Sequence, residues 1–468
     1  MKTQCHNPYL PLFEHIPDGE PRVFGDRLYI FGSHDLENGN EFCELDYVAW
    51  SAPVNDLSDW RYEGVIYRKD QDPFNKDLLP LYAPDVVRGR DGRYYLFYCV
   101  RFQDSINVAV CDTPAGAYEY YGRIQYRDGT VMTDNQPYDP SVICCEEGNF
   151  LYFGFAPCMI HIPRYQNQDL KGCSVLMLED DMLTVKEGPN VVLPSLKYGA
   201  GTDFEGNEYF EGPSIRKIND RFYLIYSSVH THQLCYAISE HPMEGFTFGG
   251  VIVSNGDVGY HGIEEQDKLM SVGNNHGGLV CVENDWYIFY HRHTSLTQYN
   301  RQGCAERIIF EEDGRIPQVT ITTSGMNPKP LSGIASYPAV YCCNLTNGHM
   351  GALSSLGRTN AEVDFPYMTS VDGQRFITNI KQDTLIGYKY IQLKETGHIC
   401  LVYRGTGEGN FEVRTKRDGE GKAIIRLTPS PFWTTAMVET DFSDEDLELY
   451  LVYRGEGSQE LLALNLLA

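Results

Sequence analysis

Five polar residues that can take part in acid–base chemistry stand in short motifs spread from residue 18 to residue 276. The motifs are Pro17-Asp18-Gly19, Tyr82-Ala83-Pro84-Asp85, Tyr138-Asp139-Pro140, Phe210-Glu211-Gly212-Pro213 and Asn275-His276-Gly277. Each Asp taken alone is typical of a turn, because its carboxylate caps nearby backbone. Glu211 differs, because aromatic residues precede it and a Gly-Pro pair follows it. Apolar rings exclude water and raise the pKa of a carboxyl group, so we expect Glu211 to keep its proton near neutrality.

Several carboxylates in one pocket destabilise a protein, so a function must account for them. Like charges in a partly dry site repel one another, so at least one pKa must rise. Chemistry or a bound cation therefore explains such a set better than stability does. One protonated and one ionised carboxyl group are the minimum for cleaving a glycosidic bond, and a third carboxylate can tune the acid. Asp18, Asp139 and Glu211 would fill these three roles, although their spacing alone does not assign them.

A repeated β pattern positions these motifs. Five segments combine a turn containing Asp, Gly or Asn with an aromatic-rich run that is typical of a strand. They are 25–31, 91–98, 147–153, 219–226 and 284–290, centred on Tyr29, Tyr95, Tyr152, Tyr223 and Tyr287. Successive tyrosines are 57 to 71 residues apart, and each polar residue lies 10 to 13 residues upstream of one. A repeat of this length holds one four-stranded sheet, so we predict an all-β fold that begins with a five-bladed β-propeller whose central channel the polar residues face.

The pattern changes after about residue 312. The stretch 323–330 contains Gly and two Pro and is typical of a linker. Strand-like runs return beyond it, and Val402-Tyr403-Arg404-Gly405 is echoed by Val452-Tyr453-Arg454-Gly455. We predict a catalytic propeller over 1–322 and a β-sandwich of the jelly-roll type over 331–468. Trp433 could stack on a sugar, but a tryptophan at such a place is more often part of a core or a domain interface.

Bulk composition restricts the partners. The chain has 468 residues, of which 42% are hydrophobic, which is enough for two domains with substantial cores. Its formal net charge of −26 argues against nucleic acid and against an anionic membrane, and a neutral substrate fits better. The 14 cysteines form no Cys-x-x-Cys pair, the N-terminus has no apolar signal-peptide core, and no run reaches transmembrane length. We expect a cytoplasmic protein with reduced thiols.

Taken together, the motifs resemble glycoside hydrolase family 43 over essentially the first 320 residues. The opening from Asn7-Pro8 through Pro17-Asp18-Gly19 to Gly32-Ser33-His34-Asp35 is similar to one branch of that family. Tyr82-Ala83-Pro84-Asp85 resembles its Trp-Ala-Pro-Asp motif, and the motifs around Asp139 and Glu211 resemble its other two carboxylate motifs. Asn275-His276-Gly277 and the run 286–293 are similar to its fifth blade.

The resemblance implies inverting hydrolysis of arabinose- or xylose-containing glycans. It implies Asp18 as the general base, Asp139 as the residue that raises the pKa of the acid and orients it, and Glu211 as the general acid. It adds a second set of site residues around the substrate: Asp85, Tyr82, Arg301 facing the substrate and the acid, and His276 beneath the pocket. His276 would also bind a calcium ion, directly or through water, and no organic cofactor is implied.

Several positions stay open. Glu20 lies two residues after Asp18 on the same face of a strand and competes for the role of base, although the family spacing favours Asp18. Tyr82 replaces a tryptophan of the family, which puts the stacking platform and the preferred sugar in doubt. Asn7-Pro8 and Asp35 belong to the branch pattern without an assigned role. The C-terminal region resembles family 6-like carbohydrate-binding β-sandwiches, which also act as braces.

One function and two alternatives follow. We predict an exo-acting α-L-arabinofuranosidase that works on arabinose-containing oligosaccharides. A β-D-xylosidase that works on xylo-oligosaccharides has the same three catalytic motifs and is the nearer alternative. A non-catalytic glycan-binding propeller belongs to a different class, and the intact set Asp18, Asp139 and Glu211 argues against it. The sequence is compatible with a homo-oligomer but does not indicate one.

Overall fold

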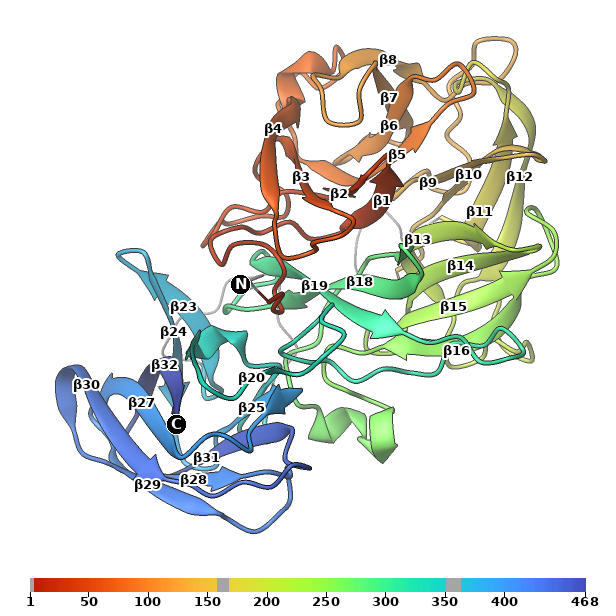
Figure 1. Cartoon of the computed structure of the whole chain (residues 1–468). Coiled ribbons are helices and arrows are strands. Elements are labelled where there is room, and N and C mark those ends of the chain that lie inside the picture. The colour runs from red at the N-terminus through yellow and green to blue at the C-terminus, as the bar shows by residue number, and fades with distance from the viewer. Residues whose placement is uncertain (1–3, 158–167, 351–362) are drawn as a thin grey trace.

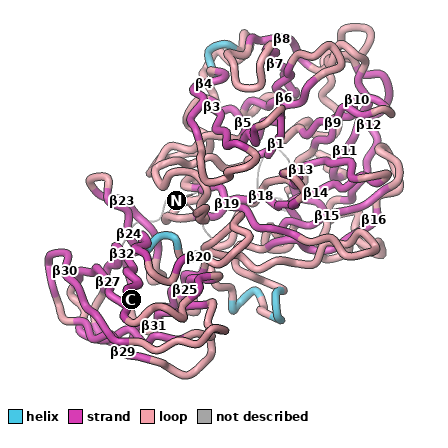
Figure 2. Tube along the Cα trace, in the orientation of Figure 1, coloured by secondary structure: helices cyan, strands magenta, loops and turns pink. Residues whose placement is uncertain are grey.

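Strands dominate the computed structural model, which describes residues 4–157, 168–350 and 363–468 (Figures 1 and 2). Within these ranges the helices are short 3-10 turns: η1 (Lys69–Gln71), η2 (Tyr260–Gly262), η3 (Glu265–Asp267) and η4 (Ala339–Tyr341). None of the described helices is long and apolar enough to cross a membrane. The prediction of an all-β fold is confirmed.

The first part of the chain forms five antiparallel sheets in succession, and in each sheet the strands pair in their sequence order. Four of these sheets have four strands and the last has three. Sheet one contains β1 (Glu20–Phe24), β2 (Arg27–Phe31), β3 (Tyr47–Pro53) and β4 (Arg61–Tyr67); sheet two β5 (Leu81–Arg88), β6 (Tyr94–Val100), β7 (Ile106–Cys111) and β8 (Glu119–Arg123); sheet three β9 (Ser141–Cys145), β10 (Gly148–Phe153), β11 (Gly172–Leu178) and β12 (Val185–Pro194); sheet four β13 (Tyr209–Ile218), β14 (Arg221–Ser228), β15 (Leu234–Ser239) and β16 (Thr247–Val253); and sheet five β17 (Leu279–Val282), β18 (Asp285–His293) and β19 (Arg301–Ile308).

The five aromatic runs of the sequence repeat form the second strand of each sheet, namely β2, β6, β10, β14 and β18. Each of them pairs with the first strand through a short hairpin. In the β1–β2 hairpin Phe24 opposes Arg27, and in the β13–β14 hairpin Ile218 opposes Arg221, so both loops have two residues. The first loop residues, Gly25 and Asn219, have φ angles of 64° and 54°. Positive φ at this place is what a tight hairpin requires, and Gly and Asn adopt it readily.

The first strands of the five sheets are neighbours in a closed cycle. β1 contacts both β5 and β17, β5 contacts β9, and β9 contacts β13. The cycle closes between β13 and β17, where Arg216 Nε donates to the carbonyl oxygen of Leu279 at 2.7 Å. Apolar cores fill the spaces between successive sheets, and one of them joins Leu28 and Ile30 of the first sheet to Val280 and Phe289 of the last. In Figure 1 these sheets take up the red-to-green part of the ribbon.

The C-terminal part forms two larger sheets that share one core. One sheet contains β21 (Ala335–Pro338), β23 (Tyr367–Val371), β24 (Gln374–Ile380), β27 (His398–Gly405), β30 (Ser430–Glu439) and β32 (Gln459–Leu467). The other contains β22 (Asn344–Thr346), β25 (Leu385–Lys389), β28 (Glu408–Arg414), β29 (Ala423–Leu427) and β31 (Glu448–Glu456), and a separate parallel pair joins β20 (Leu331–Ser332) to β26 (Ile391–Gln392). Residues of both sheets, such as Leu401 and Leu451, belong to one buried cluster.

Buried polar contacts join the two parts of the chain, which lie side by side in Figure 1. The Arg292 guanidinium of β18 donates to the carbonyl oxygens of Cys342 and Val340, both at 2.7 Å. Lys389 of β25 donates to Asp257 at 2.7 Å, and both side chains are buried. The last strand of the fifth sheet ends at Ile308 and β20 begins at Leu331; the domain boundaries at 322 and 331 stay predictions.

Candidate active site

The five polar residues of the repeat occupy equivalent places, at or just before the first strand of each sheet. Asp18 precedes β1, Asp139 precedes β9 and His276 precedes β17, whereas Asp85 lies in β5 and Glu211 lies in β13. Because these strands are neighbours in the cycle, residues distant in sequence come together. Their electrostatics reflect this proximity, since the charges of Glu211 and Asp18 both raise the pKa of Asp139.

The backbone around the three proposed catalytic carboxylates is locally unusual. Asp18 and Asp139 have φ angles of 57° and 48°, in the left-handed region that non-glycine residues seldom adopt. Glu211 lies in an irregular stretch of β13, where the register with β14 shifts on both sides of it. Pro213 suits this bulge because it has no N–H to give to a ladder. Strained backbone of this kind concentrates at functional sites, where it turns side chains away from the regular sheet.

Asp18 is held by a buried arginine. Arg301 Nη1 donates to Asp18 Oδ1 at 3.1 Å, and the same guanidinium binds Asp35 through two bonds of 2.9 Å. Burial is the largest single effect on the pKa of Asp18 and raises it. Several opposing contributions, of which the Arg301 charge is the largest, together bring the pKa below its usual value. Asp18 is therefore ionised at neutral pH. Arg301 lies between Asp18 and Asp35, and its charge also acts on Glu211, whose pKa it lowers. Its expected contact with the substrate stays a prediction.

His291 contacts Asp18 in its neutral form. The backbone N–H of Asp18 donates to His291 Nδ1 at 3.2 Å, and His291 Nε2 lies 2.6 Å from the carbonyl oxygen of Asn274. Nδ1 must accept and Nε2 must donate, so the ring carries one proton. Burial lowers the pKa of His291 well below its ordinary value, in agreement with this tautomer. The ring therefore supports the backbone of Asp18 without adding a charge.

Glu211 has the opposite electrostatic character. Burial, and after it the charge of Asp18, raises its pKa to about 8. The direction agrees with the sequence prediction, and the side chain stays partly exposed, as a proton donor must be to reach a substrate. Asp139 is buried, and burial followed by the neighbouring Glu211 raises its pKa well above the ordinary value. The charge of Asp18 also raises the pKa of Glu211, and the repulsion between Asp139 and Glu211 raises the pKa of Asp139. The expected effect of Asp139 on the pKa of the acid stays a prediction.

Asp85 and Glu20 belong to a deeper layer. Asp85 is fully buried. Its carboxylate accepts a hydrogen bond from Arg22 Nε at 2.9 Å and another from the backbone N–H of Val142 at 2.7 Å. Glu20 is fully buried as well and forms an ion pair with Arg216 at 2.7 Å. Asp85, which was predicted to bind substrate, therefore forms an ion pair with Arg22. Glu20, the alternative candidate for the general base, is paired with Arg216. Asp18 therefore remains the candidate for that role.

His276 packs against the backbone next to Glu211. A Cβ atom added to Gly212 would lie 2.9 Å from His276 Cγ, so only glycine fits between Glu211 and this ring. His276 Nε2 is buried without a hydrogen-bond partner. One nitrogen suits a bound water better than calcium, which takes six to eight oxygen ligands, and the described residues include no group of three His, Cys, Asp or Glu that could hold a metal ion. A direct calcium site does not fit these residues, and calcium held through water stays a prediction.

Aromatic rings adjoin the carboxylate motifs. Tyr82 packs edge-on against Tyr138 at a centroid distance of 5.6 Å, and Tyr138 packs against Phe155 at 5.0 Å. Phe155 in turn meets Phe210, the neighbour of Glu211, at 5.6 Å. All four rings are half-buried. They form a continuous apolar border beside Asp139 and Glu211, and such rings limit the access of water to a carboxyl group.

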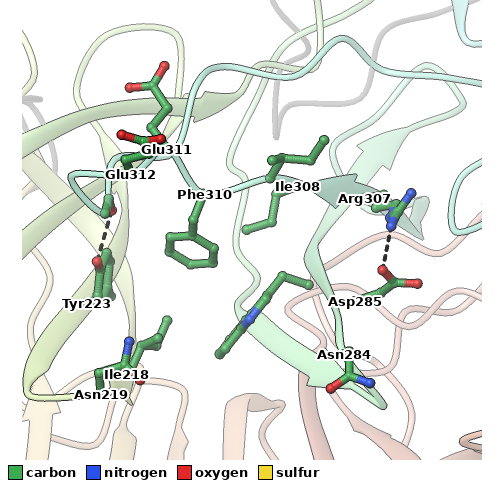
Figure 3. Close-up of a pocket in the computed structure, with 13 residues that line it drawn as sticks. Ile218, Asn219, Tyr223, Asn284, Asp285, Arg307, Ile308, Phe310, Glu311 and Glu312 are labelled. Carbon is green, nitrogen blue, oxygen red and sulfur yellow. Dashed lines mark hydrogen bonds and ion pairs between the residues drawn. The ribbon is translucent and has the colours of Figure 1, made fainter.

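A separate pocket of about 450 Å³ lies at the other end of the same strands (Figure 3). Its lining includes Asn219 at the end of the β13–β14 hairpin and Asn284 at the end of the β17–β18 hairpin. Its one arginine, Arg307, is paired with Asp285. None of the residues that line this pocket is Asp18, Asp139 or Glu211. The carboxylate cluster at the cycle of first strands is the better candidate for chemistry.

Comparison with known proteins agrees with this site. The family model "Glycosyl hydrolases family 43" matches residues 22–316. The chain belongs to family 43. It is 46% identical, over 100% of its length and 99% of the relative's, to a "Xylosidase/arabinosidase" of Thermoclostridium stercorarium. It is also 24% identical to an "Arabinoxylan arabinofuranohydrolase" of Paenibacillus polymyxa, over 97% of this chain and 73% of the relative.

Solved structures of family 43 enzymes have the same fold. A Xanthomonas citri GH43_1 enzyme complexed with xylotriose superposes with a TM-score of 0.54 at 23% identity, covering 69% of this chain and 96% of the other. An arabinoxylan arabinofuranohydrolase from Bacillus subtilis, in complex with cellotetraose, superposes with a TM-score of 0.50 at 17% identity and covers 97% of this chain and 96% of the other. As a member of family 43 the protein is a glycosidase, which sets aside the alternative of a non-catalytic propeller.

Sequence reasoning missed three parts of the site. Asp35 was noticed only as part of a branch pattern, yet it accepts three hydrogen bonds from Arg301, two from the guanidinium and one from the backbone N–H. His291 stood in the fifth-sheet motif without a role, although strand alternation places it on the same face as His293. The Glu20–Arg216 pair joins β1 to β13 over 196 residues, and no local signal could have revealed it.

Proposed function

We propose that this family 43 glycosidase is an inverting, exo-acting α-L-arabinofuranosidase with Glu211 as general acid and Asp18 as general base. The observation that carries the proposal is the opposite displacement of two pKa values in one site. Asp18 is kept ionised by Arg301, while burial raises the pKa of Glu211 to about 8. Two carboxyl groups with pKa values driven apart by their surroundings are the signature of an acid and a base.

In the proposed reaction Glu211 donates its proton to the glycosidic oxygen as the bond to the anomeric carbon breaks. Asp18 removes a proton from a water molecule, whose oxygen attacks the opposite face of the anomeric carbon, so the configuration inverts. Asp139 supports the acid, because its carboxyl group interacts with that of Glu211 and its own pKa is raised. Arg301 keeps Asp18 ionised and oriented. The proton lost by Glu211 and the proton gained by Asp18 balance through solvent.

The second candidate function is a β-D-xylosidase, which differs in the sugar that is released. Relatives carry the double name "Xylosidase/arabinosidase", and the Xanthomonas citri structure holds xylotriose. The "Arabinoxylan arabinofuranohydrolase" of Paenibacillus polymyxa, similar over 97% of this chain, supports arabinose. Tyr82, where the family motif has Trp, lies in the aromatic border and is the residue on which we expect the preference to depend.

We also propose the architecture that the sequence predicted. The closed cycle of first strands and the shared cores between successive sheets support a five-bladed β-propeller. The two C-terminal sheets with a common core support a β-sandwich related to family 6-like carbohydrate-binding modules. In this sandwich Trp433 is engaged by Arg404, 4.3 Å above its ring, and by Gln374. The sandwich thus acts as a brace in our proposal.

The proposal is tested with nitrophenyl α-L-arabinofuranoside and nitrophenyl β-D-xyloside. We expect the wild type to cleave the arabinofuranoside and Glu211→Ala to lose this activity while remaining folded. Faster hydrolysis of the xyloside would choose the second candidate. Proton NMR of the first product then reports the anomer, and retention of configuration would contradict the base role of Asp18. Addition of calcium to chelator-treated enzyme, followed by thermal unfolding, tests the water-mediated calcium at His276.

A further inference from the structure

A hairpin of the C-terminal sandwich reaches the segments that carry the proposed base. The hairpin is formed by β23 and β24, in which Val371 pairs with Gln374. The backbone N–H of Met368 donates to the carbonyl oxygen of Thr294 at 2.8 Å, next to the end of β18. Ser370 Oγ donates to Glu37 at 2.6 Å. The hairpin therefore touches the first sheet and the fifth sheet at once.

Arg375, on the same hairpin, makes the central contact. Its guanidinium forms an ion pair with Glu37 at 2.5 Å and lies 3.5 Å from His15 Nε2. His15 Nδ1 lies 3.2 Å from the carbonyl oxygen of Phe13. A ring that donates from Nδ1 has a free lone pair at Nε2, which can accept from Arg375. Burial and the Arg375 charge lower the pKa of His15 to about 4, so the ring is neutral at working pH.

The two partners of Arg375 belong to the segments that hold the two carboxylates of Arg301. Glu37 is two residues after Asp35, and His15 is three residues before Asp18. The two segments are tied to each other, because the backbone N–H of Asp35 donates to the carbonyl oxygen of His15 at 3.0 Å. A single side chain of the sandwich, that of Arg375, thus contacts both the segment that carries Asp18 and the segment that carries Asp35.

We propose that Arg375 is a positioning residue for the general base. By clamping Glu37 to the His15 segment, it fixes the separation of Asp18 and Asp35 and thereby the position of Arg301 between them. The inference rests on the proposed role of Asp18. It makes the C-terminal sandwich part of the catalytic unit, because the propeller sheets alone do not supply this contact among the described residues.

The charges around the clamp support this role rather than simple anchoring. Arg375 faces Glu37 and His15 and feels the charge of Arg292 from β18. Asp18 faces Arg301, His291 and His276, and its charge also acts on Asp35, Asp139 and Glu211. Loss of Arg375 removes no charge from contact with Asp18, so any change in the ionisation of Asp18 must pass through a shift of Arg301. Displacement of a catalytic group by about 1 Å can lower a rate by about a hundredfold.

The experiment measures the pH dependence of kcat/KM for Arg375→Ala, Arg375→Lys and a control, Arg414→Ala. Arg414 also forms an ion pair within the sandwich, with Glu412 of its own strand. We expect Arg375→Ala to lower kcat about tenfold or more with little change in KM. The acidic limb of its kcat/KM profile should move to higher pH. The reason is that a displaced Arg301 lowers the pKa of Asp18 by a smaller amount. Arg375→Lys should restore part of the rate, and Arg414→Ala should behave as wild type.

A second measurement does not depend on activity. Hydrogen–deuterium exchange should become faster in peptides covering 13–19 and 33–40 in Arg375→Ala, and should stay unchanged there in Arg414→Ala. An unmoved acidic limb together with unchanged exchange in both peptides overturns the clamp. If the wild type cleaves neither aryl glycoside, the proposed function fails, while the exchange result still decides whether Arg375 orders these segments.

Discussion

At the scale of single residues, the site depends on what surrounds otherwise ordinary carboxyl groups. Arg301 keeps Asp18 ionised, whereas burial beside the aromatic border keeps Glu211 protonated. The same network explains why Asp35 matters, since it holds the other side of Arg301. Roles that resemblance assigned by motif thus acquire a physical cause for Asp18 and Glu211.

The first prediction concerns the acid. Glu211→Gln should lower kcat by about 10²–10⁴-fold on substrates with poor leaving groups, because general acid catalysis contributes about this much. The loss should be smaller on dinitrophenyl glycosides, which need little protonation. The wild type should lose activity as pH rises through about 8, where Glu211 gives up its proton. An alkaline limb that persists in the variant would assign it to another group.

The second prediction concerns stability and pH. The pKa of Glu211 is raised from 4.5 to about 8, so the proton is bound more tightly in the folded state. The stability that this provides is complete below about pH 4.5 and is lost as pH rises to about 8. The Gln side chain of Glu211→Gln does not titrate. Between about pH 4.5 and 8 the free energy of unfolding of the variant should therefore rise by at least about 1 kcal/mol relative to that of the wild type, because one pKa unit corresponds to about 1.4 kcal/mol. Urea unfolding near pH 5 and near pH 9 measures the difference, and equal differences at both would contradict it.

The third prediction separates Asp18 from Glu20. Asp18→Asn should abolish most activity and leave the fold intact, because it removes the base. Glu20→Gln should instead destabilise the fold by about 3 kcal/mol, because Arg216 then keeps a buried charge without its partner. Activity assays and urea unfolding of both variants distinguish these outcomes. A stable, inactive Glu20→Gln enzyme would make Glu20 the base.

At the scale of elements, the bulge in β13 orients Glu211, the proposed acid. Gly212 has a φ of 65° and no room for a Cβ beside His276, whereas Gly206 has a φ of 86° and open space around it. Gly206→Ala should therefore cost about 1 kcal/mol, the strain of a left-handed alanine. Gly212→Ala should cost more than this and should also lower kcat, because the ring or the bulge must move. Thermal unfolding and kinetics of this matched pair measure both effects; equal behaviour would contradict the role of the close approach.

At the scale of the whole molecule, the C-terminal sheets and the sheets that carry the site share one buried interface. Lys389→Ala leaves Asp257 buried without its cation and should destabilise the protein by about 3–5 kcal/mol. Lys394→Ala removes an exposed ion pair with Asp444 and should cost at most about 1 kcal/mol. Calorimetry should show a single transition that moves in the first variant. Two transitions, with only one of them moved, would mean that the two parts unfold independently.

The sequence by itself determined the all-β class, the five repeated hairpins and the three carboxylate motifs. These features are local, because alternating apolar residues and Gly or Asn turns act over a few positions, and the repeat places Asp18, Asp139 and Glu211 at equivalent points. The raised pKa of Glu211 also followed from its aromatic neighbours. The family resemblance extended this to a glycosidase.

Only the tertiary structure decided which polar groups pair. Asp85 and Glu20 have the same residue types as the catalytic candidates, but Arg22 and Arg216 reach them from other strands and neutralise them. Arg301 meets Asp18 and Asp35 across more than 260 residues, and Arg375 reaches His15 across 360. Ion pairing depends on distance in space, and local sequence carries no record of a partner that the closure of five sheets brings into contact.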